Sequence, residues 1–300
     1  MTAETRPRVH SVVVGDAATE PRRRVVFLHG LFGRGKNLMR IAAGLEPEAR
    51  SLLVDLPNHG RSAWTDTFDY VEIADLVAEH LRAFAAEGGA DAAERAPLGN
   101  GRGAGSGGPA ADDARVDVVG HSMGGKVAMV LALRHPELVR RLVVIDIAPI
   151  ASGSSRGEFR HLLDALAAVD LAAVERRTDA DAALRAAIPE YGVRGFLLQN
   201  LRRGDHGFEW EPNLRLLREQ LSAVMGFPDL VGHRFTGPVL WIGGERSDYI
   251  SDEDAPVMRA LFPRTVRMTV RGAGHWVHSE KPDEVITALR TFLLSDPDRD

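Results

Sequence analysis

Short runs of β-branched and aliphatic residues alternate along the chain with longer stretches whose apolar positions recur at helical spacing. Such runs predict buried strands, because branched side chains pack well on a pleated sheet. The predicted strands are residues 11–14, 24–28, 51–55, 116–119, 142–147, 239–242 and 267–270. The predicted helices are residues 38–45, 70–86, 125–134, 255–261 and 283–294. This alternation predicts an α/β fold in which helices cover a mainly parallel central sheet.

One segment that interrupts the alternation is residues 87–114, which are rich in glycine, alanine and aspartate. Such a composition cannot form a packed core, so we predict a flexible surface insert. A phosphate-binding glycine loop is the alternative for the same segment. It is disfavoured because no strand leads into the segment and no helix with a Lys-Ser/Thr pair follows it.

A second interruption is residues 151–234, which contain helical patterns without a convincing strand. The patterned stretches are residues 158–169, 181–188 and 214–225. An insertion between strands at this place covers the carboxyl ends of the sheet, where ligands bind in α/β folds. We therefore predict a helical cap over a core that consists of residues 1–150 and 235–300.

The pentapeptide Gly120-His121-Ser122-Met123-Gly124 lies between a predicted strand and a predicted helix. This order is typical of a nucleophile elbow, in which a strained turn exposes a serine hydroxyl at the head of a helix. Glycines flank the serine because the turn leaves no room for side chains on either side. The helix dipole and the free amides at this point favour developing negative charge. Ser122 is therefore the candidate nucleophile.

A serine hydroxyl needs a base to accept its proton, and His275 is the best placed of the 11 histidines. It follows the last predicted strand, and a histidine after the serine in chain order is typical of enzymes with this elbow. His29 and His121 lie in glycine turns, where we expect structural hydrogen bonds. His278 has no glutamate or second histidine at the spacing of a metal-binding helix, so no metal site is predicted.

Two further roles belong to the same chemistry. The oxyanion of a tetrahedral intermediate needs hydrogen-bond donors, and the expected ones are the amides of Met123 and of Leu31, which lies in a glycine turn after an early strand. The acid that orients the base has two candidates at strand ends. Asp248 lies in a polar loop, whereas Asp146 ends an apolar strand, where a carboxylate is costly unless it is paired. The residues alone leave both aspartates open.

Five motifs occur together, and they are His29-Gly30-Leu31-Phe32-Gly33, Asp55-Leu56-Pro57-Asn58-His59-Gly60-Arg61-Ser62, the elbow with Gly125-Lys126, Ile145-Asp146-Ile147-Ala148-Pro149 and Gly274-His275-Trp276-Val277-His278. This set resembles the YbfF-type esterases of bacteria and is similar to the mitochondrial members of the α/β-hydrolase-domain family. The most specific mark is Asn58-His59-Gly60. The resemblance covers residues 10–294 apart from the insert. It implies an α/β-hydrolase fold with Asp146 as the acid, although this chain departs from better-known members by carrying Asp248.

The resemblance implies a serine hydrolase that cleaves carboxylic esters, and in some members acyl-CoA thioesters, through an acyl-enzyme. Apolar cap residues are expected to form the acyl pocket, namely Phe196, Leu197, Leu198 and Trp210. The alternatives are a C–C bond hydrolase or lyase with the same triad, and a small-molecule-binding protein without catalysis. Dehalogenase and epoxide hydrolase functions are disfavoured, because they require an aspartate where Ser122 stands.

Composition narrows the function classes further. The chain has 300 residues and no cysteine, which excludes disulfides and thiolate chemistry. A net charge of −5 gives no argument for nucleic acid, and no apolar run reaches the length of a signal peptide core or of a membrane span, about 18 residues. We expect a cytoplasmic enzyme with a small-molecule ester substrate, no cofactor and no membrane insertion. The oligomeric state is left open.

Overall fold

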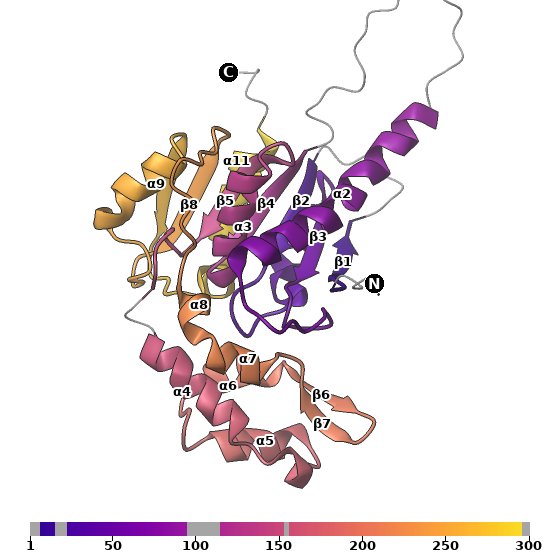
Figure 1. The fold of residues 1–300 in the computed structure, drawn as a ribbon, viewed down its shortest axis with the longest axis vertical. Coiled ribbons are helices and arrows are strands. Elements are labelled where there is room, and N and C mark those ends of the chain that lie inside the picture. The colour runs from indigo at the N-terminus through magenta and orange to yellow at the C-terminus, as the bar shows by residue number, and fades with distance from the viewer. Residues whose placement is uncertain (1–6, 16–22, 95–114, 153–155, 296–300) are drawn as a thin grey trace, which may run out of the picture.

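A central sheet organises the computed structural model, which describes residues 7–15, 23–94, 115–152 and 156–295 (Figure 1). Its strands are β1 (His10–Val14), β2 (Arg23–Leu28), β3 (Ala49–Asp55), β4 (Val116–His121), β5 (Val139–Ile145), β8 (Val239–Gly244) and β9 (Thr265–Val270). They lie in the order β1-β3-β2-β4-β5-β8-β9. All neighbours are parallel except the edge pair β1 and β3. The predicted strands and their mainly parallel arrangement are confirmed.

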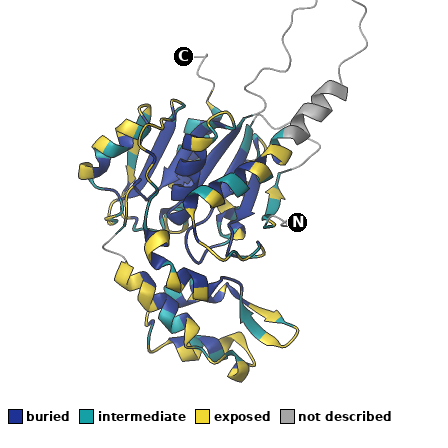
Figure 2. Cartoon of the chain, viewed as in Figure 1, coloured by how far each residue is buried: buried dark blue, intermediate teal, exposed yellow. Residues whose placement is uncertain are grey.

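Helices cover both faces of this sheet. They are α1 (Met39–Ala43), α2 (Tyr70–Glu94), α3 (Met123–Arg134), α9 (Ala255–Leu261), α10 (Val277–Glu280) and α11 (Pro282–Leu294), with 3-10 turns at Gly35–Leu38 and Asp252–Asp254. Alternate residues of a strand face opposite sides. On β2, Val26 and Leu28 pack in the cluster that contains α2 and α3, whereas Val25 and Phe27 pack with α1 and α11. The central strands are accordingly buried along their length (Figure 2).

The structure corrects part of the prediction for the segment after residue 86. The insert was expected to begin at residue 87, but α2 continues to Glu94. Alanine is the strongest helix former and occurs repeatedly here, and two glycines in a helix cost only about 1 kcal/mol each. The composition argument underestimated this local preference. The rest of the expected insert, residues 95–114, lies outside the described residues.

Between β5 and β8 the chain forms a second layer at one end of the sheet (Figure 1). We call residues 156–225 the α4–α8 layer. It consists of α4 (Arg156–Ala167), a 3-10 turn at Leu171–Ala173, α5 (Arg177–Leu184), α6 (Tyr191–Leu198), β6 (Leu201–Gly204), β7 (Gly207–Trp210), α7 (Leu214–Glu219) and α8 (Leu221–Met225). Its residues line cavities together with the loops that follow β2 and β4. The layer therefore lies over the carboxyl ends of these strands.

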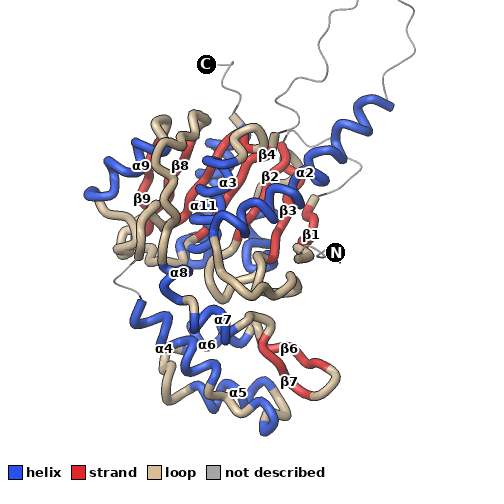
Figure 3. The backbone as a smooth tube through the Cα atoms, viewed as in Figure 1, coloured by secondary structure: helices blue, strands red, loops and turns tan. Residues whose placement is uncertain are grey.

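The expectation that this layer lacks strands is wrong. Strands β6 and β7 form an antiparallel hairpin, with Leu201 opposite Trp210 and a turn that ends at Gly207 with φ +127° (Figure 3). Each strand has only four residues, and β6 carries two adjacent arginines, so the pattern is too short to identify the pair as strands. The predicted helix 214–225 is also divided at Gln220, whose side-chain amide oxygen accepts a hydrogen bond from the Phe68 amide at 2.8 Å.

Candidate active site

The turn between β4 and α3 has the geometry of a nucleophile elbow. Ser122 has φ +53° and ψ −121°, a conformation that is strained for a residue with a side chain. A side chain at Gly120 would collide with the backbone of Gly124, and one at Gly124 would collide with the carbonyl groups of Leu28 and His29. Backbone atoms cannot move aside as a flexible side chain can. Gly120 is therefore required by the tightness of the elbow, and Gly124 by the close approach of the chain after β2.

A continuous line of hydrogen bonds joins Ser122, His275 and Asp146. The Nε2 atom of His275 lies 3.0 Å from Oγ of Ser122, and its Nδ1 atom lies 2.8 Å from Oδ2 of Asp146. The carboxylate can only accept from the neutral ring, so Nδ1 carries the proton and Nε2 accepts from the serine hydroxyl. These three residues come from loops after β4, β9 and β5, which end at the same edge of the parallel sheet.

Asp146 is almost completely buried, and its environment satisfies its charge. Strand β5 ends at Ile145 rather than at residue 147 as predicted, because Asp146 turns away from the strand with φ +56°. Its Oδ1 atom accepts a hydrogen bond from the Gly244 amide at 2.9 Å, and its Oδ2 atom accepts one from the Ser247 hydroxyl. These donors offset the cost of burying a carboxylate.

Asp248, the other predicted acid, is exposed on the loop after β8. The structure does not bring it to the histidine, whose Nδ1 atom is engaged by Asp146. The residues on either side of Asp248 do reach the site. Ser247 donates to Asp146, and the Tyr249 ring stacks on the His275 ring at 3.9 Å between centroids. Sequence reasoning missed both, although a polar loop at the carboxyl end of β8 was a signal for such contacts.

The two expected oxyanion donors lie beside the serine. Leu31 and Met123 line one cavity together with Ser122. Met123 is the first residue of α3, so its amide has no acceptor within the helix. The loop that carries Leu31 approaches closely, since a Cβ atom on Gly30 would lie 3.2 Å from Cβ of Ser122. Both residues thus lie next to Ser122.

Two narrow cavities meet at Ser122. The α6 cavity is lined by residues of the early glycine turn and of α6, including Phe196 and Leu197, and the α8 cavity by residues that include Met225 of α8. Of the expected acyl-pocket residues, Leu198 and Trp210 line neither. Each cavity has a volume of about 20 Å³, roughly the space that one water molecule needs. A substrate chain therefore requires the surrounding side chains to move.

Four further histidines surround the site, namely His29, His59, His121 and His278. The Nδ1–H group of His29 donates to the Gly30 carbonyl at 2.8 Å, and its Nε2 atom accepts from the Leu56 amide at 3.0 Å. The Nε2–H group of His121 donates to the His275 carbonyl at 2.9 Å. The structural hydrogen bonds predicted for His29 and His121 are thus present. The His121 bond also links the elbow directly to the loop that carries the candidate base.

These histidines are neutral at pH 7, because burial lowers the pKa of each. Burial lowers the pKa of His59 to about 3 and, together with the nearby His275, that of His278 to about 4. Burial and then the neighbouring histidines hold the pKa of His121 well below its usual value. Burial also lowers the pKa of His29. The site therefore gathers several imidazoles without gathering positive charge.

A pH dependence of stability follows from these shifts. Each histidine takes up a proton on unfolding below pH 6.5, so the free energy of unfolding falls as pH drops from 6.5 toward 4. The loss is up to about 1.4 kcal/mol per pH unit for each such group. The variant His59→Asn keeps a donor toward the Pro57 carbonyl. We expect it to reduce the dependence of the unfolding free energy on pH by about 1.4 kcal/mol per pH unit, which corresponds to one proton. Urea unfolding at pH 5, 6 and 7 measures it, and equal slopes for the two proteins would contradict this role of His59.

The comparisons with known proteins all point to alpha/beta hydrolases. Residues 25–288 match the model of the Alpha/beta hydrolase family. The chain is 34% identical over 295 residues to the sn-1-specific diacylglycerol lipase ABHD11 of Mus musculus, covering 96% of this chain and 85% of that protein. It is 30% identical over 269 residues to Esterase YbfF of Escherichia coli strain K12, covering 90% and 92%. A marine microorganism esterase superposes with a TM-score of 0.82 at 28% identity, covering 96% and 100%.

Membrane-spanning helices and clusters of metal-binding side chains are both absent from the described residues. None of the helices in this part of the chain combines the length and the apolarity that crossing a bilayer requires. Within the same residues, no group of three or more histidine, aspartate or glutamate side chains is arranged to hold a metal ion.

Proposed function

This chain belongs to the alpha/beta hydrolase family and is an enzyme of its esterase type, and we propose that it hydrolyses carboxylic esters through an acyl-enzyme formed on Ser122. The family model and the relatives confirm the predicted resemblance and fold. The observation that carries the proposal is the hydrogen-bonded line from Ser122 through His275 to Asp146. Each member has the partner that its role in acyl transfer requires.

In the proposed acylation step, Oγ of Ser122 attacks the ester carbonyl carbon while Nε2 of His275 accepts the hydroxyl proton. The ring then becomes positively charged, and the buried carboxylate of Asp146 stabilises that charge through the proton on Nδ1. The carbonyl oxygen gains negative charge in the tetrahedral intermediate. The amides of Leu31 and Met123 donate hydrogen bonds to it, an interaction that strengthens as the charge develops.

Collapse of the intermediate expels the alcohol, which takes the proton from His275 and leaves an acyl ester on Ser122. The same histidine then accepts a proton from water, and the resulting hydroxide attacks the acyl carbonyl. The acid is released and the serine hydroxyl is restored. His275 is thus the base in the first half of each step and the acid in the second.

The substrate chain is proposed to bind between the sheet and the α4–α8 layer, which acts as the cap. Supporting this, Phe159 of α4 lines both cavities at Ser122, and Phe196 and Trp276 extend the apolar wall of the α6 cavity. These walls favour apolar acyl or alcohol groups over charged ones. The proposal includes acyl-CoA thioesters as a second class of acyl donor, because a thioester is attacked by the same steps.

A substrate panel tests the function directly. It contains p-nitrophenyl esters from acetate to dodecanoate, acyl-CoAs of the same chain lengths and a vinylogous 1,5-diketone of the kind that C–C bond hydrolases cleave. We expect turnover of the esters. Because the cavity walls are apolar, we expect kcat/KM to be higher for an ester with a longer acyl chain than for the acetate. Turnover of the diketone alone would favour the C–C hydrolase alternative. Tight binding of esters without turnover would favour a binding protein.

A further inference from the structure

Lys126 carries a buried amine that the proposed chemistry does not use. It is one of three lysines in the chain, the others being Lys36 and Lys281. It lies on α3, one turn after Ser122, and its own amide donates to the Ser122 carbonyl at 3.0 Å. Its side chain is 2% exposed. A buried ammonium is costly unless oxygen atoms accept from it, so its partners indicate what it does.

Those partners lie on both segments that join the α4–α8 layer to the sheet. The Nζ atom donates to the Met225 and Gly226 carbonyls, each at 2.8 Å, on the segment that leaves α8 toward β8. It also lies 3.3 Å from Oγ of Ser152, on the segment that leads from β5 to α4. We call Ser152 and residues 224–226 the junction. One ammonium group on the nucleophile helix thus contacts both sides of the junction.

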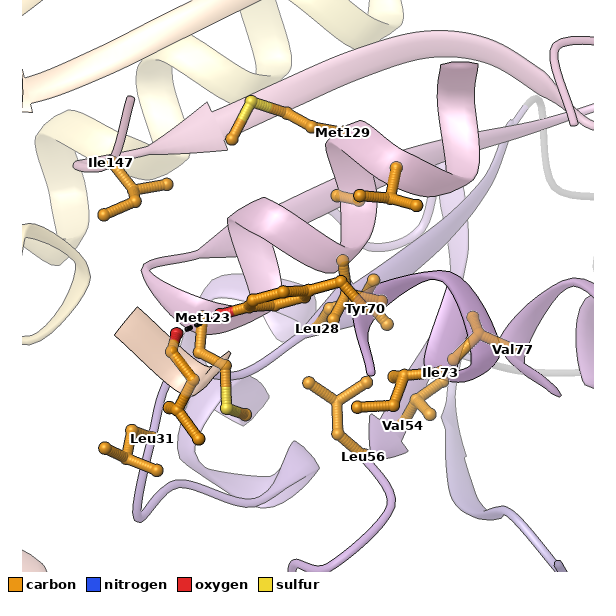
Figure 4. Close-up of a cluster of buried hydrophobic side chains, with 14 of the residues drawn as sticks. Leu28, Leu31, Val54, Leu56, Tyr70, Ile73, Val77, Met123, Met129 and Ile147 are labelled. Atoms are coloured by element: carbon orange, nitrogen blue, oxygen red, sulfur yellow. Dashed lines mark hydrogen bonds between the residues drawn. The ribbon is translucent and has the colours of Figure 1, made fainter. Parts of the chain in front are cut away.

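Tyr70 contributes a second donor from α2. Its hydroxyl donates to the Val224 carbonyl at 2.6 Å, and its ring lies in the buried cluster beside Leu31 and Met123 (Figure 4). The last carbonyls of a helix have no partner within it, and α8 ends at Met225. Tyr70 donates to the Val224 carbonyl and Lys126 to the Met225 and Gly226 carbonyls, and the Met225 carbonyl also accepts from the Ser152 amide at 2.8 Å. A cation at this end of a helix is also favoured by the helix dipole.

The junction is part of the wall of the substrate cavity. The residues that line the α8 cavity include Ser122, Lys126, Ser152, Met225 and Phe159, the last lying in the first turn of α4. A displacement of either connecting segment moves the helix attached to it and, with that helix, one of these side chains. The serine itself is also held away from the junction, because β4 pairs with β5 and the Ser122 amide donates to the Ile145 carbonyl at 3.0 Å.

We propose that Lys126 is a positioning residue, which fixes the junction of the α4–α8 layer to the nucleophile helix and so shapes the cavity that binds the substrate chain. Burial lowers the pKa of its amine to about 7, and both protonation states of the amine donate hydrogen bonds. The proposal rests on the proposed ester hydrolysis for its kinetic consequence. The mechanical part, in which Lys126 holds the junction, stands on the contacts alone.

Lys126→Met tests the kinetic part, because methionine has a similar length and no donor. We expect KM for p-nitrophenyl octanoate to rise about tenfold, because the junction without these hydrogen bonds would hold the cavity in its binding-competent shape only about a tenth of the time. KM for the acetate and kcat for both esters stay within about twofold, since the triad is held elsewhere. Tyr70→Phe, an isosteric change, shifts the same KM by about threefold. Met129→Leu is the matched control, a volume-conserving change at a buried position of α3 that we expect to leave all constants unchanged.

Amide hydrogen exchange, followed by mass spectrometry without substrate, tests the mechanical part. We expect Lys126→Met and Tyr70→Phe to speed exchange in residues 149–152 and 221–227, and Met129→Leu not to. If Lys126→Met does not fold, Tyr70→Phe decides by the same two readouts. A uniform fall in kcat for both esters, or unchanged exchange at the junction, would overturn the proposal. Faster exchange in a protein that hydrolyses no ester would uphold the positioning role and reject the proposed function.

Discussion

Ser122→Ala should abolish ester hydrolysis while leaving the fold intact. We expect kcat for p-nitrophenyl esters to fall by about 10⁴- to 10⁶-fold, the loss typical of removing the nucleophile of such a triad. Alanine differs from serine by one oxygen atom and tolerates the strained φ of the elbow about as well, so the thermal midpoint should hardly change. The initial rate of p-nitrophenol release measures the effect.

Ser279→Ala is the matched control for this substitution. Ser279 is an exposed serine on α10, four residues after His275, and its side chain lies outside the proposed machinery. We expect full activity for this variant. A Ser122→Ala protein that keeps more than a few per cent of the activity would show that hydrolysis does not pass through Ser122.

The second large effect distinguishes the two candidate acids. Asp146→Asn should lower kcat by about 10⁴-fold, because an asparagine amide turned toward the ring favours the wrong tautomer of the histidine. Asp146 also accepts from the Gly244 amide, and the asparagine oxygen can still accept there, so the protein should remain folded. Asp248→Asn should change kcat by less than about twofold, since its carboxylate is exposed and apart from the ring.

Kinetics of the two purified variants, with circular dichroism to check folding, measure this difference. The reverse ranking, with Asp248→Asn the more damaged protein, would mean that the loop after β8 rearranges to supply the acid. Equal mild losses would mean that neither aspartate orients His275. The hydrogen bond of 2.8 Å between Nδ1 and Asp146 is the basis for the ranking that we expect.

The sequence was most informative where local pattern and motif agree. The parallel strands were predictable because β-branched runs such as residues 116–119 end in glycine turns, and the elbow was predictable because its glycines have a single structural explanation. Phe196 and Leu197 were also predicted to lie near the serine, and they line the α6 cavity. For the strands and the elbow, the signal lies within a few residues of the feature.

Features that depend on distant contacts could not be predicted in this way. The β6–β7 hairpin forms by the pairing of two four-residue segments, which are too short for their pattern to identify them as strands. The choice between Asp146 and Asp248 depends on which carboxylate turns toward a loop more than 25 residues further along the chain. The contacts of Lys126 with Met225 and Gly226 span about a hundred residues. Contacts between such distant residues leave no periodic pattern in the local sequence.

The central claim, acyl transfer through Ser122, is tested most directly by labelling with a fluorophosphonate and mapping the adduct. Such a probe reacts with a serine that a neighbouring base has activated. Trypsin, which cleaves after arginine and lysine, releases residues 116–126 as one peptide whose only serine is Ser122. We predict one adduct per chain on this peptide, and a much slower reaction in His275→Ala. A folded protein that hydrolyses esters while this peptide stays unlabelled would contradict the account.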